Sequence, residues 1–370
     1  MRSILICGSR GYPARYGGFE TLTQELSEYW SDEGFRITVT GFFGKGNERF
    51  FLKNEQQRVV RTVTVEYSGW SRLANLFATF KAVRIACRHD EFDGAIVLND
   101  VNFFTAWFLQ VKKGIPVVIH LDGDESARRG IPWPGRALHW VLRAASINFI
   151  NKIVVDSRAL LPRVPQRHLK KVSVIKYGFS RISTAKESIY QDFPELRDGY
   201  FLNIARFVPE NNVAEIIEAY LNSNRDLPLV ILGKGTGAKS YELKVEELAM
   251  KALGQIRLLE AEYDSKKLCT LIEESSLYIH GHEAGGTNPV LVTARQYATF
   301  LASHDNFYNR EDCRSDEEFW SSVSSLTSIM NSKLSLPINK YNATPPNLNP
   351  ESWAEIADQY LELLVNIERE

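Results

Sequence analysis

The chain has 370 residues, of which 44% are hydrophobic and 24% are charged, and its formal net charge is -1. This length suits two α/β domains better than one hydrophobic core. The balanced charge argues against a nucleic-acid-binding protein, which normally carries a basic excess, so we expect no nucleic-acid partner.

The cysteines Cys7, Cys87, Cys269 and Cys313 are scattered along the chain. Their spacing is typical neither of a zinc site nor of a redox pair, and it favours reduced thiols in a cytosol. The N-terminal stretch has no basic region or small-residue cleavage site, and no apolar run is long enough to span a bilayer. We therefore expect a cytoplasmic protein.

Apolar strands alternate with amphipathic segments along the first half of the chain. This alternation is typical of parallel sheets covered by helices. The clearest helix covers residues 19–34, with Leu22, Leu26 and Tyr29 on one face and Gly34 as its stop. The predicted strands are residues 3–9, 37–42, 63–68, 94–99, 117–121, 152–157 and 171–177.

The alternation resumes after a polar segment without sustained periodicity. It continues through residues 200–206, 214–223, 227–233, 241–253, 256–261, 266–275, 277–282 and 299–304. Residues 350–370 form an amphipathic pattern, with Pro350 and Glu351 in the expected first helical turn. We predict Rossmann-like domains at 1–177 and 200–349, a linker at 178–199, and a C-terminal helix at 350–370 that can cross back to the first domain.

A glycine-rich turn, "GSRGYPARYGGFETL", connects the first strand and the first helix. Gly17 and Gly18 can bring backbone N–H groups close to a phosphate, and the helix that begins near Phe19 adds its positive end. A dinucleotide site is disfavoured, because Gly8 and Gly11 are only three apart and no acidic residue follows the second strand. The alternative is a tight turn without a ligand.

Two further turns follow predicted strands in the second half. In "NIARFVPENNVAEIIEAY", Arg206 ends a strand and Pro209 opens a helix, a combination that suits a diphosphate. In "HGHEAGGTNPVLVTARQYATF", Gly285 and Gly286 lead to a helix near Pro289, whose free N–H groups could face an anion or a sugar hydroxyl. A surface arginine and a structural turn are the alternatives, but three such loops together favour a phosphate-bearing ligand.

Together these stretches resemble the retaining glycosyltransferases of family 4, and most closely the rhamnosyltransferase-like branch of bacterial polysaccharide, capsule or O-antigen synthesis. The likeness rests on "GSRGYPARYGGFET", "ARFVPENN" and "YIHGHEAGGTNP". The stretches "HLDGDE", "VVDS", "KYG", "EAEYDSKKL" and "NFYNRE" follow in the same order. The resemblance implies the α/β GT-B fold, with two Rossmann-like domains whose parallel sheets face a central cleft.

The resemblance also implies that a nucleotide-sugar donor lies in that cleft. Gly17 and Gly18 would face the sugar and diphosphate from the acceptor-side domain, and Arg206 would neutralise the diphosphate. Many members carry a lysine where this chain has Asn211, and Lys234 could replace part of the missing charge. Tyr263 matches the segment near the nucleotide base. The residues that match the sugar-cradling loop include Glu283, Gly285, Gly286, Thr287 and Asn288.

Asp122 matches the position that faces the reacting centre, and Glu125 follows it on the acceptor side. In the alternative interpretation, Asp122 caps a turn and Glu125 is solvated. Most members hold the ribose with a glutamate that stands here as Thr293, and its partner glutamate corresponds to Gly285. The rhamnosyltransferase-like branch shares the glycine but not the threonine, so we expect looser nucleotide binding.

The resemblance implies transfer of a sugar with retention of configuration, with dTDP-L-rhamnose as the expected donor. The resemblance also implies a lipid-linked saccharide as the acceptor, at the inner face of the cytoplasmic membrane. Because protein cations and helix dipoles can balance the diphosphate, we expect no metal and no cofactor.

Two segments mix aromatic and basic residues in a way that can suit an anionic membrane surface. Residues 69–88 contain Trp70, Leu73, Phe77 and Phe80 beside Arg72, Lys81, Arg84 and Arg88, and residues 128–143 contain Trp133 and Trp140 beside several arginines. Contacts within the hydrophobic core are the alternative explanation.

Other classes of function remain open on the same scaffold. A non-catalytic nucleotide-sugar-binding or partner protein is favoured if the changes at Asn211 and Thr293 have removed activity. An epimerase would need an acid–base pair beside the sugar, and a phosphorylase would need a lysine-bound cofactor; neither can be identified from the residues.

Overall fold

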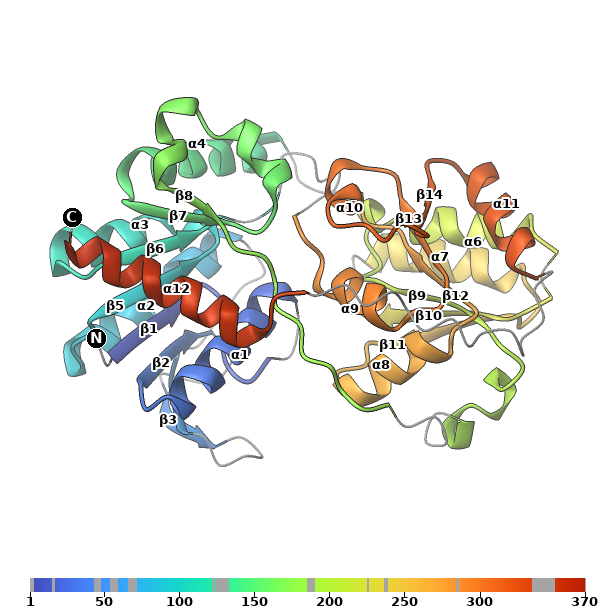
Figure 1. Ribbon diagram of the computed structural model, residues 1–370, viewed down its shortest axis with the longest axis horizontal. Coiled ribbons are helices and arrows are strands. Elements are labelled where there is room, and N and C mark those ends of the chain that lie inside the picture. The colour runs from blue at the N-terminus through green and yellow to red at the C-terminus, as the bar shows by residue number, and fades with distance from the viewer. Residues whose placement is uncertain are drawn as a thin grey trace. The chain divides into compact units, whose positions relative to one another are not determined.

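The computed structural model describes residues 3–14, 17–42, 48–53, 59–65, 72–121, 123, 133–184, 190–224, 226–235, 239–283, 286–334 and 350–369. The chain forms two compact units, each containing one sheet (Figure 1). Unit 1 comprises Met1–Ser126, Ile131–Phe179 and Glu351–Glu370. Unit 2 comprises Ser180–Pro350.

Unit 1 contains a sheet of strand order β3-β4-β2-β1-β5-β6-β7-β8. Its strands are β1 (Ser3–Cys7), β2 (Arg36–Gly41), β3 (Glu48–Lys53), β4 (Val59–Thr64), β5 (Gly94–Leu98), β6 (Val117–His120), β7 (Lys152–Val155) and β8 (Val172–Val174). Among the described strands, neighbours run parallel except for β3 and β4. Every residue of β1 and β5 is buried, as expected for central parallel strands covered on both faces.

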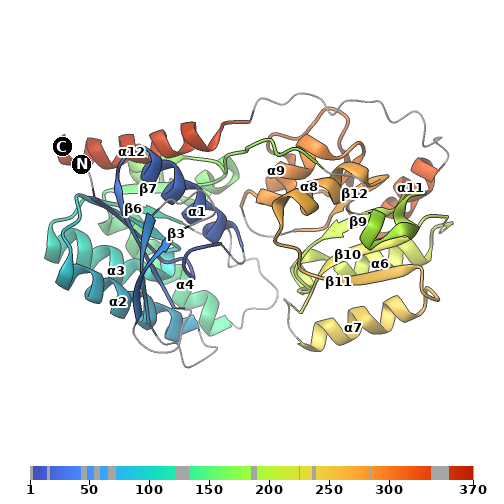
Figure 2. The same ribbon diagram turned by 90° about the horizontal axis from the view of Figure 1, so that it is seen from below.

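Helices cover both faces of this sheet. They are α1 (Gly18–Asp32), α2 (Arg72–His89), α3 (Phe103–Trp107), α4 (Trp133–Phe149) and α12 (Trp353–Arg369), and a π-helical segment, Phe108–Lys112, continues α3. Figure 2 shows α1 and α12 on one face and α2, α3 and α4 on the other. The C-terminal helix therefore contributes to the core of unit 1, where Trp353, Ile356 and Tyr360 are buried.

The α12 helix begins three residues later than its sequence pattern suggested. Ser352 accepts a hydrogen bond from the Glu355 N–H at 3.2 Å, and Glu355 accepts one from the Ser352 N–H at 2.7 Å. This reciprocal pair is a capping box, so Pro350 and Glu351 precede the helix rather than forming its first turn.

Unit 2 contains a sheet of strand order β11-β10-β9-β12-β13-β14, whose described neighbours are all parallel. Its strands are β9 (Phe201–Ile204), β10 (Leu229–Lys234), β11 (Ile256–Glu260), β12 (Leu277–His280), β13 (Leu301–His304) and β14 (Glu318–Trp320). Its helices are α6 (Val213–Leu221), α7 (Lys239–Met250), α8 (Ser265–Glu274), α9 (Pro289–Tyr297), α10 (Phe307–Arg310) and α11 (Val323–Leu334). The α/β class with parallel sheets is thus confirmed.

Residues of the segment expected to be a linker pack against unit 2. Tyr297 Oη donates to the Ile182 carbonyl at 2.8 Å, and Tyr190 Oη donates to Glu274 at 2.7 Å. Arg181 lies over the Tyr297 ring at 5.7 Å. These contacts attach the segment to α8 and α9.

Candidate functional site

Four loops of unit 2 meet at the carboxyl edge of its sheet. Because β11, β10, β9 and β12 are consecutive neighbours and run parallel, the residues that follow them emerge at one edge. Arg206 follows β9, Lys234 ends β10, Tyr263 follows β11, and Glu283 follows β12. The sheet order therefore gathers residues that are far apart in the sequence.

Two glycines allow these loops to approach one another closely. A Cβ atom at Gly233 would lie 1.9 Å from the Ala205 carbonyl oxygen, and one at Gly281 would lie 2.3 Å from the Asn211 carbonyl oxygen. Gly233 also has a φ of +129°, which disfavours any residue with a side chain. The ends of β10 and β12 can thus pass beside the turn that contains Arg206.

Asparagine side chains hold this turn in place. Asn211 Nδ2 donates to the Arg206 carbonyl at 2.9 Å, and Asn212 Nδ2 donates to the Gly281 carbonyl at 2.9 Å. The Glu283 N–H donates to the Glu210 carbonyl at 3.0 Å. Asn211 is buried, and its side-chain amide is already bonded within the turn. It therefore shapes the loop around half-buried Arg206.

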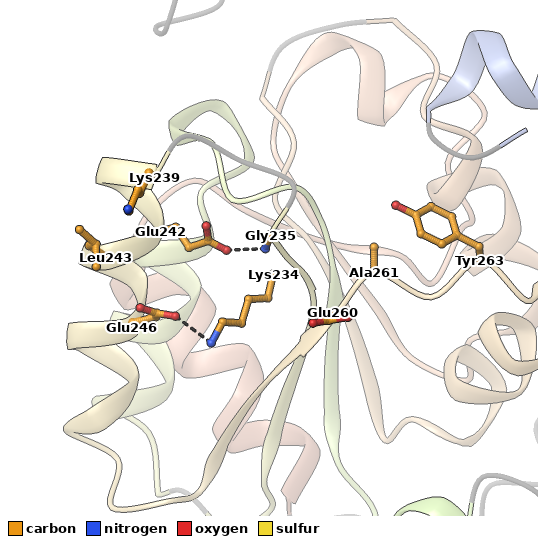
Figure 3. Close-up of a pocket in the computed structure, with 9 residues that line it drawn as sticks. All are labelled: Lys234, Gly235, Lys239, Glu242, Leu243, Glu246, Glu260, Ala261 and Tyr263. Atoms are coloured by element: carbon orange, nitrogen blue, oxygen red, sulfur yellow. Dashed lines mark hydrogen bonds and ion pairs between the residues drawn. The ribbon is translucent and has the colours of Figure 1, made fainter. Parts of the chain in front are cut away.

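A pocket of about 550 Å³ opens beside this edge (Figure 3). Lys234, Gly235, Lys239, Glu242, Leu243, Glu246, Glu260, Ala261 and Tyr263 line it. Tyr263 is 57% exposed, which leaves its ring accessible to a ligand. The three carboxylates outnumber the two lysines, so the lining suits the hydroxyl and amino donors of a nucleoside better than phosphate oxygens.

Lys234 is engaged with a residue of α7. Its Nζ lies 2.8 Å from Glu246 Oε1, and this ion pair raises the pKa of Lys234 (Figure 3). Glu242 accepts a hydrogen bond from the Gly235 N–H. A diphosphate would therefore have to draw Lys234 away from Glu246, a competition that is not visible from the sequence because the two residues are brought together only by the fold.

The N-terminus of α9 is capped by Asn288. Its Oδ1 accepts from the N–H groups of Val290 at 2.9 Å and Leu291 at 3.4 Å, so these two N–H groups at the start of the helix already donate to Asn288. Gly286 and Thr287 precede the cap, whereas Gly285 lies outside the described residues.

Thr293 is half-buried in the following turn of α9. Its Oγ1 donates to the Pro289 carbonyl at 3.0 Å, which leaves the oxygen lone pairs able to accept. Thr293 Oγ1 can thus accept one hydrogen bond from a ribose hydroxyl.

Residues after β13 hold the base of the loop that follows β12. Asn306 Nδ2 and Asn309 Nδ2 each donate to the His282 carbonyl at 2.9 Å. Both asparagines lie within "NFYNRE", but nothing in that stretch alone indicates their partner. The His282 ring stacks on His280 with centroids 4.5 Å apart.

His280 is fully buried, and neither ring nitrogen has a hydrogen-bond partner among the described residues. Burial, with smaller contributions from His282, Arg295 and His304, holds the pKa of His280 well below its usual range. The ring is consequently neutral at physiological pH.

In unit 1, the first turn of α1 places the Glu20 carboxylate beside the glycine turn that precedes the helix. Glu20 is buried and accepts a hydrogen bond from the Arg10 N–H at 3.0 Å. Gly17, at the N-cap with a φ of +91°, lies so close that a Cβ there would be 2.8 Å from Glu20 Oε2. Beside this negative charge, the Gly17–Gly18 turn suits a sugar hydroxyl better than a diphosphate.

Asp122 and Glu125 lie outside the described residues, but Gly123 between them is described. Arg143 of α4 donates through Nη2 to the Gly123 carbonyl at 3.0 Å. Arg143 Nε also lies 2.7 Å from Asp100 Oδ2, and His139 Nε2 lies 2.8 Å from Asp100 Oδ1. The buried Asp100 thus helps to hold Arg143 in the position where it contacts Gly123.

Among the described residues, no cluster of histidine, cysteine, aspartate or glutamate side chains is arranged to hold a metal ion. Within the same part of the chain, no helix is long and apolar enough to cross a membrane.

The chain was compared with protein-family models, curated sequences and solved structures. Residues 1–179 match a family model described as a domain of unknown function (DUF1972). No curated protein sequence matches the chain significantly.

The solved structures similar to this chain include sucrose-phosphate synthase from Thermosynechococcus elongatus, with a TM-score of 0.81, 13% identity and full coverage of both chains. They also include Anabaena Alr3699/HepE in complex with UDP-glucose, with a TM-score of 0.70, 14% identity, and coverage of 100% of this chain and 98% of that one. The chain has the GT-B fold.

A third similar structure is the UDP-forming α,α-trehalose-phosphate synthase from Burkholderia xenovorans in complex with glucose-6-phosphate. Its TM-score is 0.73 at 10% identity, and the match covers 98% of this chain and 100% of that chain. At these identities the likeness concerns the fold.

Proposed function

We propose that the protein is a glycosyltransferase that moves a sugar from a nucleotide-sugar donor to a saccharide acceptor. One observation carries the proposal: the Arg206 turn, the Lys234–Tyr263 pocket and the loop after β12 meet at one sheet edge. Support comes from the shared GT-B fold, because similar structures include a complex with UDP-glucose and a complex with glucose-6-phosphate.

The donor would bind to unit 2 in three parts. The nucleoside would occupy the pocket beside Tyr263, where carboxylates can accept its hydrogen bonds. Arg206 would face the diphosphate, since a guanidinium forms strong charge-assisted hydrogen bonds with phosphate oxygens. The sugar would lie against the loop from Glu283 to Asn288, and Thr293 would accept a hydrogen bond from the ribose.

Transfer would break the bond between the anomeric carbon and the diphosphate oxygen and form one to the acceptor oxygen on the same face of the sugar. Arg206 would stabilise the negative charge that develops on the diphosphate, usually the largest catalytic contribution. The acceptor hydroxyl would give its proton to the departing phosphate oxygen. Asp122 would orient that hydroxyl, and Arg143 holds the neighbouring Gly123.

The identity of the donor and the acceptor is inferred from the resemblance of the sequence motifs to the rhamnosyltransferase-like glycosyltransferases. We propose dTDP-L-rhamnose as the donor and a lipid-linked saccharide at the inner face of the cytoplasmic membrane as the acceptor. The reaction would need neither a metal nor a cofactor, because Arg206 supplies the positive charge beside the diphosphate.

A panel of nucleotide sugars tests this function. We expect one donor to raise the melting temperature and to release its nucleoside diphosphate when an acceptor lipid extract is added. The anomeric configuration of the product, followed by NMR, reports retention or inversion. If donors bind but none is turned over with any acceptor, the protein is instead a non-catalytic nucleotide-sugar-binding protein of the same fold.

A further inference from the structure

The outward side of α4 in unit 1 carries an apolar stripe. Trp133, Ala137, Trp140 and Val141 are exposed, and their spacing places them on one face of the helix. Trp133 and Trp140 are 74% and 69% exposed. The opposite face contributes buried Leu142 to the unit, so the helix is apolar on both its inner and outer sides.

The neighbouring helix α3 also carries exposed apolar side chains. Phe104 and Trp107 of α3 and Val111 of the following π-helical segment are all exposed. The ring of Phe103 lies 5.3 Å from Phe104 and 6.1 Å from Phe149 at the end of α4, which connects the two helices.

The outward side of α2 adds positive charge. Phe77, Lys81, Arg84 and Arg88 are exposed, and their spacing of four, three and four residues places them on a single stripe. The helices α2, α3 and α4 cover the same face of the sheet, with α3 in contact with both others (Figure 2). We call the exposed side chains of α2, α3, the π-helical segment and α4 the aromatic-basic face.

The charge of this face is one-sided. The residues of α2, α3, the π-helical segment and α4 include no aspartate or glutamate, although the whole chain has a net charge of -1. Its exposed cations are Lys81, Arg84, Arg88, Lys112 and Arg136, with Lys113 directly after the π-helical segment. Lys112 Nζ lies 5.7 Å from the centre of the Trp107 ring, so cationic and aromatic groups are intermixed.

We propose that the aromatic-basic face docks on the surface of an anionic lipid bilayer. Exposed tryptophan and phenylalanine side chains favour the interfacial region of a membrane, and lysine and arginine are attracted to anionic headgroups. A second copy docked through the same face would bring like charges together, which disfavours a symmetric dimer. The inference rests on the surface of unit 1 and goes beyond the proposed reaction.

Vesicle co-sedimentation of the full chain tests the docking. Vesicles of phosphatidylcholine alone are compared with vesicles of equal parts phosphatidylcholine and phosphatidylglycerol. We expect binding to the anionic vesicles only, with release as salt is raised, because surface charges are screened within about 8 Å at physiological ionic strength. Tryptophan emission should shift to the blue on binding.

Two sets of variants separate the contributions. The Lys81→Gln, Arg84→Gln, Arg88→Gln triple variant should lose about a hundredfold in vesicle affinity, at roughly fivefold per cation near an anionic surface. The Trp140→Ser, Val141→Ser double variant should lose affinity and most of the emission shift. The matched control on unit 2, Met250→Ser with Lys251→Gln, alters an exposed apolar and an exposed basic residue and should bind like the wild type.

Because all substituted side chains are exposed, the melting temperatures of the variants should match that of the wild type. Equal binding to neutral and anionic vesicles, or no binding to either, would overturn the proposal. A lipid-free dimer that the Trp140→Ser, Val141→Ser variant abolishes would also overturn it and assign the face to a second copy. Donor turnover by the non-binding variants with a water-soluble acceptor distinguishes failure of docking from failure of the proposed reaction.

Discussion

Arg143 and Asp100 form a partly buried ion pair that joins α4 to the carboxyl end of β5, with Nε 2.7 Å from Oδ2. Asp100 is completely buried, and the same guanidinium donates to the Gly123 carbonyl at 3.0 Å. The Arg143 guanidinium therefore links Asp100 to Gly123, a described residue that follows β6.

Arg143→Met should lower the free energy of unfolding by about 3 kcal/mol, because it leaves a buried carboxylate without its arginine partner. Arg143→Lys should recover part of that stability, since it keeps the charge but loses the two-pronged contact with Asp100 and Gly123. Urea unfolding measures both. Equal stability of Arg143→Met and the wild type would show that the pair contributes nothing.

Loss of Glu246 should release Lys234 for the donor. In Glu246→Gln, Lys234 loses the partner that raises its pKa, and nucleoside diphosphate should bind about twofold to fivefold more tightly, the range expected for an exposed ion pair. Lys234→Met should weaken the same binding. Calorimetric titration measures both affinities, and wild-type affinity in both variants would show that Lys234 makes no contact with the diphosphate.

Thr293→Glu should strengthen nucleotide binding. A carboxylate at this position on α9 can accept ribose hydrogen bonds more strongly than the hydroxyl, with an expected gain of about 1 to 2 kcal/mol. Thr293→Val serves as the matched control, since it removes the acceptor with little change in shape. The order of donor preference should stay the same in competition assays, because the sugar contacts lie elsewhere. Turnover by Thr293→Glu alone, with an inactive wild type, would indicate a degenerate transferase.

Stability should depend on pH through His280. Its pKa in the folded protein lies well below the usual value of 6.5, so the unfolded chain binds a proton first as the pH falls. The free energy of unfolding should therefore decrease as the pH drops below 6.5 and continue to decrease toward the lower folded pKa. His280→Phe should remove this part of the dependence. Parallel pH profiles of the two proteins would contradict the assignment.

The central strands could be located from the sequence because burial on both faces gives nearly continuous apolar runs. The strand predicted at residues 63–68 lies earlier in the structure, where β4 is Val59–Thr64. The alternation of apolar residues continues on both sides of Val63, so the pattern alone does not define the ends of this strand. The edge strands β3 and β14 were not predicted, and β14 has only three residues. In such short or peripheral strands, pairing with a neighbour decides the conformation more than the local pattern does.

The positions of the site loops followed from the rule that parallel strands end at one edge, but their partners did not. Glu246 meets Lys234 only because α7 folds back beside β10, and Asn306 reaches His282 only because β13 pairs with β12. Likewise, Glu20 becomes a feature of the glycine turn through its bond to Arg10. These contacts depend on tertiary geometry, which sequence spacing does not encode directly.

Donor-dependent release of nucleoside diphosphate, compared between the wild type, Arg206→Ala and Arg257→Ala, tests the proposed transferase most directly. Arg257 is an exposed arginine of β11 and provides the matched control. We predict that one donor is turned over in the presence of acceptor, and that Arg206→Ala loses at least tenfold in diphosphate affinity, the effect of one charge-assisted contact of about 1.5 to 3 kcal/mol. Arg257→Ala should behave like the wild type. Unchanged affinity and turnover in Arg206→Ala would contradict a donor site at this edge of the sheet.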